Sequence, residues 1–553
     1  MRTAGSVEGT REGRKWLILV AVSLGMMLGV FNIALVNIAV PALVRDLGSS
    51  VSQVSWVLNA FNITQAVLLL SFGRLADRFG PRRIFLTSVV VFTAFSLACG
   101  FAQNVGQLIA FRIMQGVGSA GMVPVSLVIL IRAFPPSERG LATGVWGAFG
   151  QAAAILGAPI GGLLIGYASW HWVFFMNVPL GIAAAVMAFL VVPDLAGERE
   201  KAGLDLPGIG FSGAALFCLT LAIIQGNNWG WRSAPVVALL ASFVIAIAAF
   251  VGWEYRARRP MLDLGLFRIR AFSTSTGMSV LGGVGMTAGS LMLILFMINV
   301  LGFSEAKAAT VMIPASCVTL VLSPFAGRLV DVAGPRFLGA TGALLSATGF
   351  ALFGTLRADS GVGSIIWRGM FIGVAMAVNM PAIMAAGLTS LPSRSQGVGS
   401  GMISTAQQVG NVVGLALLLS IYGHAALGAT HDTVTEASAY VAAQQTLAPE
   451  AKDETMRVIN WNAQENGAAQ AQGGGVFDPV AGLTGALTGK ADAATIEKVR
   501  ADISAIGKDH SGRSYIWSFL VGSFAALCNV PLAFRLGRRL ADPETAELVS
   551  SQP

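Results

Sequence analysis

The chain has 553 residues, of which 54% are hydrophobic and only 12% charged, whereas about a quarter of the residues of an ordinary soluble domain are charged. This composition excludes a soluble globular protein, because apolar runs of about 20 residues recur, each long enough to cross a hydrocarbon layer of roughly 30 Å as a helix. The net charge of +8 does not indicate nucleic-acid binding, since the basic residues flank the apolar runs, where they orient a membrane protein.

The apolar runs predict an all-α membrane protein with fourteen transmembrane helices. An even number of helices places both termini on one side, and the first run has no signal-peptide cleavage site, so we expect it to be an uncleaved span. The expected helices cover residues 16–40, 54–73, 84–103, 107–131, 141–168, 172–193, 207–226, 235–252, 272–301, 308–327, 337–356, 364–390, 399–423 and 515–534.

Arginine and lysine residues set the expected orientation. They concentrate in the segments on the side of the termini, and the short loops opposite contain only Arg45, Arg232, Lys307 and Arg357. Because basic residues beside a span resist translocation, we predict cytoplasmic termini. The protein is expected to be a multi-pass protein of the bacterial plasma membrane, which is the inner membrane in bacteria that have two membranes.

Residues 424–514, between the last two predicted helices, are long and polar and by parity lie outside the cell. Ile496, Val499, Ile503 and Ile506 follow one another at helical spacing, which predicts short amphipathic helices. Two interpretations are open for this segment: a tolerated insertion, or a lid over an outer opening. It is also a candidate surface for an extracytoplasmic partner.

An eleven-residue segment occurs twice in the chain. Residues 73–83 and 327–337 are identical at seven of eleven positions, and each copy follows the second helix of a six-helix unit. This duplication predicts a cytoplasmic N-terminus (1–15), an N-terminal six-helix bundle (16–193), a linker with two extra helices (194–270), a C-terminal six-helix bundle (271–540) with the insertion 424–514, and a cytoplasmic tail (541–553).

These segments resemble the loop signature, called motif A, of the major facilitator superfamily, and the chain is most similar to its fourteen-span drug:proton antiporter branch. The resemblance covers residues 16–424 and the last helix, and it implies that the two copies gate the contact between the bundles. Glycines allow a tight turn and an aspartate can face a helix N-terminus. The expected gating residues are Gly73, Arg74, Asp77, Gly80, Arg82 and Arg83, with Gly327, Arg328, Asp331, Gly334 and Arg336 in the second copy.

Three further segments support the resemblance. Residues 112–118 look like motif B, whose arginine, here Arg112, is linked with coupling or substrate contact; the alternative is an arginine reaching to the outer surface. Gly157, Pro159, Gly161 and Gly162 resemble the exporter signature motif C, although small residues at this spacing also simply allow close helix packing. Residues 169–181 are similar to the branch's junction between the fifth and sixth helices, with His171 where arginine is usual.

The branch usually places a proton-carrying aspartate on the first helix, but the matching position here is Asn32. Every acidic residue falls outside the middle third of a predicted helix; Asp77, Glu138 and Glu254, for example, are expected in inner loops. Because cavities that accept cations generally offer a carboxylate, the intramembrane charges Arg112 and Arg368 favour neutral or anionic substrates. Whether protons drive transport is left open.

Polar side chains at helical spacing outline a predicted apolar cavity with a few amide groups. These candidates for substrate contact or coupling are Asn32, Asn59, Asn62, Gln65, Arg112, Gln115, Arg368, Asn379, Gln407, Gln408 and Asn411. The four cysteines and four histidines have no spacing typical of a disulfide framework or a metal site, and no P-loop occurs. We therefore expect no cofactor, no metal and no enzymatic activity.

The favoured function is a secondary active transporter that exports amphipathic small molecules, such as drugs or natural products, by alternating access. Two alternatives stay open: a lipid or glycolipid transporter of the same fold, and a non-transporting sensor or assembly protein derived from it. The resemblance implies a monomer surrounded by membrane lipids.

Overall fold

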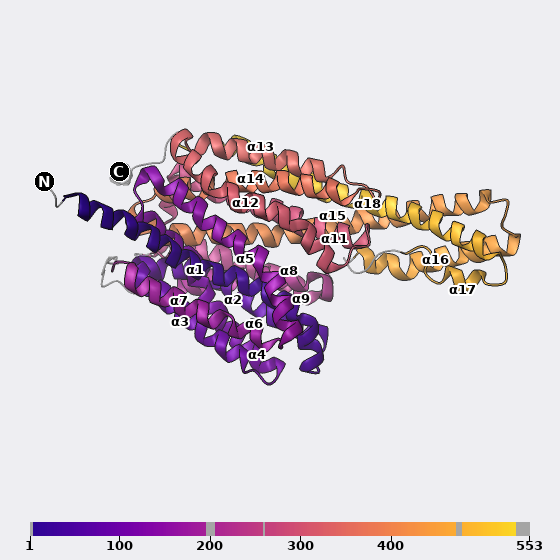
Figure 1. Cartoon of the computed structure of the whole chain (residues 1–553), viewed down its shortest axis with the longest axis horizontal. Coiled ribbons are helices and arrows are strands. Elements are labelled where there is room, and N and C mark those ends of the chain that lie inside the picture. Colours follow the sequence, from indigo (N-terminus) through magenta and orange to yellow (C-terminus); the bar gives the residue numbers. More distant parts are fainter. Residues whose placement is uncertain (1–3, 195–204, 258–259, 472–477, 538–553) are drawn as a thin grey trace.

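The computed structural model describes residues 4–194, 205–257, 260–471 and 478–537 and consists almost entirely of helices (Figure 1). Fourteen helices among the described residues are long and apolar enough to cross a membrane. This confirms the predicted number and class. The predicted tail at 541–553 and most of residues 194–205 lie outside the described residues, so nothing is added about them.

The first six spans form the N-terminal bundle. They are α1 (Ala4–Asp46), α2 (Val51–Phe79), α3 (Pro81–Gly100), α4 (Val105–Ala133), α5 (Arg139–Tyr167) and a sixth span made of α6 (His171–Phe175) and α7 (Asn177–Val191). The helix α1 begins about three turns before the predicted start at residue 16. A short 3-10 turn, η1 (Pro136–Glu138), joins α4 to α5.

The two linker helices are α8 (Leu206–Trp229) and α9 (Ala234–Arg256), followed by the turn η2 (Leu264–Arg268). The C-terminal bundle contains α10 (Arg270–Thr287), a π-helical turn (Ala288–Met292), α11 (Leu293–Asn299), α12 (Glu305–Ala333), α13 (Pro335–Phe353), α14 (Val362–Thr389), the turn η4 (Ser393–Ser395), α15 (Gln396–Ala443) and α18 (Ala493–Ala533). The predicted helix at 272–301 is therefore interrupted by the π turn.

The two bundles lie side by side (Figure 1); α8 packs on α2 of the N-terminal bundle and on α15 of the C-terminal one, and α9 packs on α8. Two helix pairs hold them together: α5 packs on α12, and α2 packs on α15. Each pair joins the second span of one bundle to the fifth span of the other, as a twofold relation between the halves requires. We call the end of the bundles where α1 begins and α18 ends the terminal face.

The segment 424–514 is a folded helical projection rather than a loop. The helix α15 continues to Ala443, α18 begins at Ala493, and α16 (Pro449–Ala471) and α17 (Leu483–Leu487) pack between them around a core of their own, which includes Val441, Ile459 and Leu487. The predicted spacing is confirmed, because Ile496, Val499 and Ile503 are buried in this core and Ile506 is half-buried. Short helices are present as α16 and α17, but residues 493–508, which we expected to form a short amphipathic helix, belong to the 41-residue helix α18. Figure 1 shows the projection pointing away from the bundles instead of folding across them.

The repeated segments make the tight turn that their glycines predict, but almost no loop. The helix α2 runs to Phe79 and α3 starts at Pro81, with only Gly80 between them. Gly80 has φ +91° and its counterpart Gly334 has φ +85°, a backbone conformation that strongly favours glycine. Most side chains of each segment therefore lie on helix ends at the terminal face.

Candidate functional site

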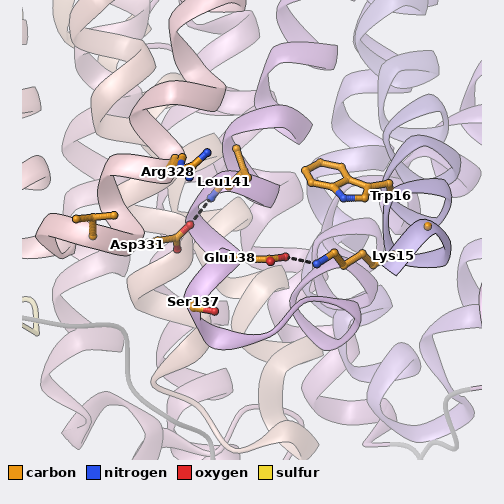
Figure 2. Close-up of a pocket in the computed structure, with 9 residues that line it drawn as sticks. Lys15, Trp16, Ser137, Glu138, Leu141, Arg328 and Asp331 are labelled. Atoms are coloured by element: carbon orange, nitrogen blue, oxygen red, sulfur yellow. Dashed lines mark hydrogen bonds and ion pairs between the residues drawn. The ribbon is translucent and has the colours of Figure 1, made fainter. Parts of the chain in front are cut away.

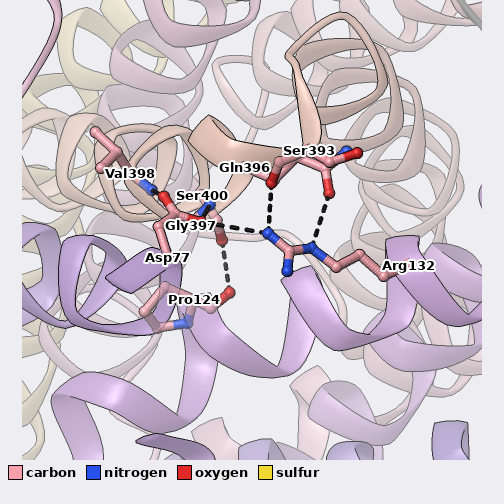
Figure 3. Close-up of polar contacts among 8 residues, drawn as sticks. All are labelled: Asp77, Pro124, Arg132, Ser393, Gln396, Gly397, Val398 and Ser400. Carbon is pink, nitrogen blue, oxygen red and sulfur yellow. Dashed lines mark hydrogen bonds and ion pairs between the residues drawn. The ribbon is translucent and has the colours of Figure 1, made fainter. Parts of the chain in front are cut away.

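Asp77, in the last turn of α2, caps the start of α15 in the opposite bundle. Its two carboxylate oxygens accept hydrogen bonds from the backbone N–H groups of Gly397 and Val398, both at 2.8 Å (Figure 3). The first N–H groups of a helix have no partner within the helix and carry the positive end of its dipole, so a carboxylate there is favourable. This contact, the Asp77 cap, joins the two bundles at the terminal face.

Arg132, at the end of α4, reinforces the Asp77 cap. Its guanidinium lies 3.4 Å from the Asp77 carboxylate and also donates hydrogen bonds to the side chain of Gln396 and the backbone carbonyl of Ser393. Nearby, the Ser400 hydroxyl donates to the Pro124 carbonyl across the same boundary at 2.8 Å (Figure 3). The Asp77 side chain is only 3% exposed, so these hydrogen bonds are shielded from water.

Asp331, in the last turn of α12, makes the corresponding contact in the other direction. It accepts hydrogen bonds from the N–H groups of Gly140 at 2.7 Å and Leu141 at 2.9 Å, at the start of α5. This is the Asp331 cap. The two caps show that both copies of the repeated segment bind the fifth span of the opposite bundle, as the gating hypothesis requires.

Glycines bring the backbones close enough for both caps. A Cβ atom on Gly73 would stand 2.3 Å from the carbonyl oxygen of Gly397, and one on Gly327 would stand 2.1 Å from that of Gly140. Real Cβ atoms do not approach a carbonyl oxygen so closely, so each crossing needs glycine on both helices. The first glycine of each repeated segment therefore serves the approach of the two bundles rather than the turn, which Gly80 and Gly334 make.

The two caps differ in their surroundings. Arg132, beside the Asp77 cap, lies eight residues before Gly140. The residue eight positions before Gly397, at the corresponding place in the other bundle, is Thr389, whose hydroxyl donates to the carbonyl of Ala385 in its own helix. The Asp331 cap borders a cavity of about 710 Å³ lined by α1, η1, α5 and α12 (Figure 2). There Lys15 forms an ion pair of 2.6 Å with Glu138, and Asp331 is half-buried.

Arg112, on α4, is the centre of a buried polar cluster in the N-terminal bundle. Its side chain is 1% exposed, which excludes the alternative of an arginine that reaches to the surface. The guanidinium donates to the backbone carbonyl of Val57 at 3.0 Å, to the Gln115 side chain at 2.8 Å and to Asn32, and it stacks on the ring of Phe61. All of these partners are neutral.

The predicted polar set divides between the bundles. Gln65 is buried near the Arg112 cluster and donates to Ser119 at 2.7 Å, while Asn59 and Asn62 are half-buried. In the C-terminal bundle Asn411 donates to Gln408 at 2.8 Å, and Gln407 and Asn379 are half-buried. No hydrogen bond recorded between the residues that the structure describes connects the two groups.

Arg368 stands at the position on α14 that Arg112 has on α4, but it does not have the same environment. It is half-buried and donates to Ser364, one turn earlier, and to the Thr355 hydroxyl at 3.0 Å, at the end away from the terminal face. The sequence predicts that both arginines lie inside the membrane, but only the Arg112 side chain is fully surrounded by other residues.

The motif C residues pack α5 against α1. A Cβ on Gly157 would stand 2.4 Å from the Cβ of Ala34, and one on Gly161 would stand 3.1 Å from the Leu35 side chain, whereas Gly162 has open space. Close packing next to Asn32 is thus the observable role of this segment. Pro159 lies inside α5.

Sequence reasoning missed the partners of the caps. Gly140 and Gly397 belong to a second internal repeat, in which residues 135–144 and 392–401 share a proline, the capping glycine five residues later and another glycine after four more. Comparing the chain with itself beyond the first repeat would have found it. Asp77 and Glu254 were expected in loops, but both lie inside helices and are buried.

The fold and the repeats can be set beside known proteins. The sequence profile of the Major Facilitator Superfamily matches residues 22–205 and 206–415. The chain belongs to the major facilitator superfamily. It is accordingly a multi-pass plasma-membrane protein of a family of transporters, not enzymes. Among solved structures, the human organic anion transporter MFSD10 has a similar fold, with a TM-score of 0.53 over 73% of this chain and 93% of that one, at 14% sequence identity.

Several curated relatives are named as export or resistance proteins. The chain is 34% identical to the tetracenomycin C resistance and export protein of Streptomyces glaucescens, over 74% of this chain and 76% of the relative. It is 28% identical to the multidrug transporter protein MdtP of Bacillus subtilis, over 75% and 76%, and 27% identical to the methylenomycin A resistance protein of the same species, over 75% and 90%. These names support drug efflux and give no support to the lipid-transport alternative.

Proposed function

We propose that this protein is a secondary active transporter that exports amphipathic small molecules from the cell by alternating access of its two bundles. The observation that carries the proposal is the pair of caps, Asp77 on α15 and Asp331 on α5, which join the bundles at the terminal face. A hydrogen bond to a charged group contributes about 1.5–3 kcal/mol, so a few such bonds can hold one face closed and still be broken during a cycle.

The terminal face is, on this proposal, the cytoplasmic gate. The basic residues beside it fit that orientation, since Arg74, Arg132 and Arg328 all lie on helix ends there. With both caps formed, the structure corresponds to a state closed toward the cytoplasm. Opening toward the cytoplasm requires both caps to break, because each spans the boundary between the bundles.

The Arg112 cluster favours neutral or anionic substrates over cations. Arg112 is a buried positive charge surrounded only by neutral acceptors, so its uncompensated field attracts an anionic group of a substrate and repels a cation. Asn32 cannot exchange a proton, so proton coupling, if protons drive export, needs a titratable group elsewhere in the chain. A monomer is the expected working unit, and the helical projection is the surface on which a partner outside the cell would bind.

Export should be measured with inverted membrane vesicles that contain the full chain. We expect uptake of amphipathic compounds that depends on an ion gradient across the membrane, with anionic and neutral members of a size-matched panel favoured over cationic ones. Vesicles that contain the Asp77→Asn/Asp331→Asn double variant provide the matched control. Wild-type vesicles that move no compound, or that move compounds equally after all ion gradients are collapsed, would contradict secondary active export.

A further inference from the structure

The linker helices contain a buried acidic group that the cap and the Arg112 cluster do not use. Glu254, in the last turn of α9, is 4% exposed. One of its oxygens, Oε2, accepts a hydrogen bond from the N–H of Leu262 at 3.2 Å, while Oε1 has no hydrogen-bond partner among the described residues. A buried ionised carboxylate without a cation or enough donors is costly and tends to bind a proton instead.

A second carboxylate lies next to Glu254. Asp205 caps the start of α8, and a Cβ atom on Gly208 would stand 2.6 Å from Asp205 Oδ2 and 2.8 Å from Glu254 Oε1. The Oε1 atom of Glu254 and the Oδ2 atom of Asp205 therefore both lie beside the position that this Cβ atom would occupy. The absence of a side chain at Gly208 leaves room for both.

The two acids are supplied with donors very unequally. Asp205 accepts from the N–H of Gly208 at 2.9 Å, from the indole of Trp253 at 2.7 Å and from the N–H of Met261 at 3.1 Å. Three donors stabilise its ionised form, whereas Glu254 has one. When two neighbouring carboxyl groups share a site, the one with fewer donors is the one that binds the proton.

We propose that the pair of Glu254 and Asp205 binds one proton, held on Glu254 Oε1 beside the ionised Asp205, and that this proton controls the Asp77 cap. The charged groups that act on Glu254 are Asp205 from α8 and Arg74 from α2. Asp263, the next acid along the connecting segment, is exposed and caps η2 through the N–H of Gly265.

A packed cluster connects the acid pair to the cap. Met261 and Leu262, which donate to the two acids, pack in one apolar cluster with Leu70, Phe250 and Val398. Val398 is one of the two residues that donate to Asp77.

With the proton bound, Glu254 is neutral and needs no further donor, so residues 261–262 stay packed on Val398 and the cap is stable. When the pH rises and the proton leaves, the ionised carboxylate attracts the neighbouring N–H groups, the packed cluster shifts and the cap weakens. The inference rests on the proposed function for its meaning in transport, but the proton and the response of the cap can be measured without any substrate.

The test uses the purified full chain and three forms: wild type, Glu254→Gln and the matched control Asp263→Asn, which removes an exposed acid of the same segment. Infrared spectroscopy detects the C=O stretch of a protonated carboxyl group. We expect a band at neutral pH in the wild type and in Asp263→Asn that disappears at high pH and is reduced in Glu254→Gln. An unchanged band in Glu254→Gln would overturn the proton site, even if the protein exports drugs.

Hydrogen exchange of the amides at 397–398 reports the cap. After correction for the intrinsic effect of pH on exchange, we expect these amides to exchange several-fold faster at high pH in wild type and Asp263→Asn, and to stay slow at every pH in Glu254→Gln, which resembles the protonated form. If Glu254→Gln follows the wild-type pH dependence, the acid pair does not control the cap. Failure of export in the wild type, with both of these results as expected, would instead count only against the proposed function.

Discussion

The two bundles repeat the same design in different surroundings. In the N-terminal bundle the capping aspartate, Asp77, is buried and has Arg132 beside it, and the arginine of the fourth span, Arg112, is enclosed by neutral partners. In the C-terminal bundle Asp331 is half-exposed beside a cavity, and Arg368 lies near the opposite end. Duplication thus preserved the backbone crossings, which glycine geometry dictates, but not the charges around them.

Because of this difference, equivalent positions in the two bundles should contribute unequally to the closed state and to substrate binding. A hydrogen bond to a buried charge is shielded from competing water, whereas an exposed one is partly replaced by water when it breaks. We therefore expect the N-terminal bundle to contribute the substrate charge site and the stronger cap, and the C-terminal bundle to contribute the weaker cap. Four experiments test this comparison.

The largest effect is expected for Arg112→Met, with Arg368→Met as the control at the repeated position. Methionine fills much of the volume of arginine but leaves Asn32, Gln115 and the carbonyl of Val57 without their donor. Export of anionic compounds should fall at least about tenfold, since about 1.4 kcal/mol corresponds to that factor. Initial rates in vesicles, normalised to the amount of folded protein, measure the effect. Equal losses in the two variants would contradict the unequal roles of the two arginines.

Removing the carboxylate charge should weaken the Asp77 cap more than the Asp331 cap. Asn at residue 77 or 331 keeps one acceptor oxygen, so one of the two N–H groups of the capped helix loses its carboxylate partner. For Asp77→Asn the loss is about 1.5–3 kcal/mol in the closed state, since Arg132 also loses its anion; for Asp331→Asn it is about 1 kcal/mol or less, because water reaches the site.

Amide hydrogen exchange can separate the two caps. Exchange at 397–398 in Asp77→Asn should rise by at least about tenfold, and exchange at 140–141 in Asp331→Asn should rise much less. The reverse order would show that exposure does not decide the strength of a cap in this protein.

Part of this site could be predicted from the sequence and part could not. The repeated segments revealed the duplication and both aspartates, because a repeat can be read directly from residue identity. The repeat could not reveal that Arg132 lies beside Asp77, since Arg132 is on another helix and only the folded bundle brings the two side chains together. Burial of Glu254 was missed for the same reason: a charged residue near a predicted helix end was assigned to a loop, and the segment at 261–262 that covers it is separate in sequence.

A smaller effect is expected for Asn32→Asp. Asn32 accepts a hydrogen bond from Arg112, so an aspartate there forms an ion pair with the guanidinium and cancels its charge. The preference for anionic over cationic compounds should decrease by several-fold, and export should become more dependent on pH. Relative export of the charge-varied panel at two pH values measures both. An unchanged preference would show that the α1–α4 contact does not face the substrate path.

The smallest effect on transport is expected in the helical projection, an addition that the N-terminal bundle lacks. Ile459 is fully buried in the core of the projection, so Ile459→Ala should destabilise that core by about 2–5 kcal/mol. Faster hydrogen exchange should be confined to residues 437–503, and export should stay within about twofold of wild type, a difference well below 1.4 kcal/mol. The reason is spatial: the core of the projection contains no residue of either cap or of the Arg112 cluster. A parallel loss of export would show instead that the projection takes part in the cycle, and the difference between the two bundles would then include the outer face as well as the terminal one.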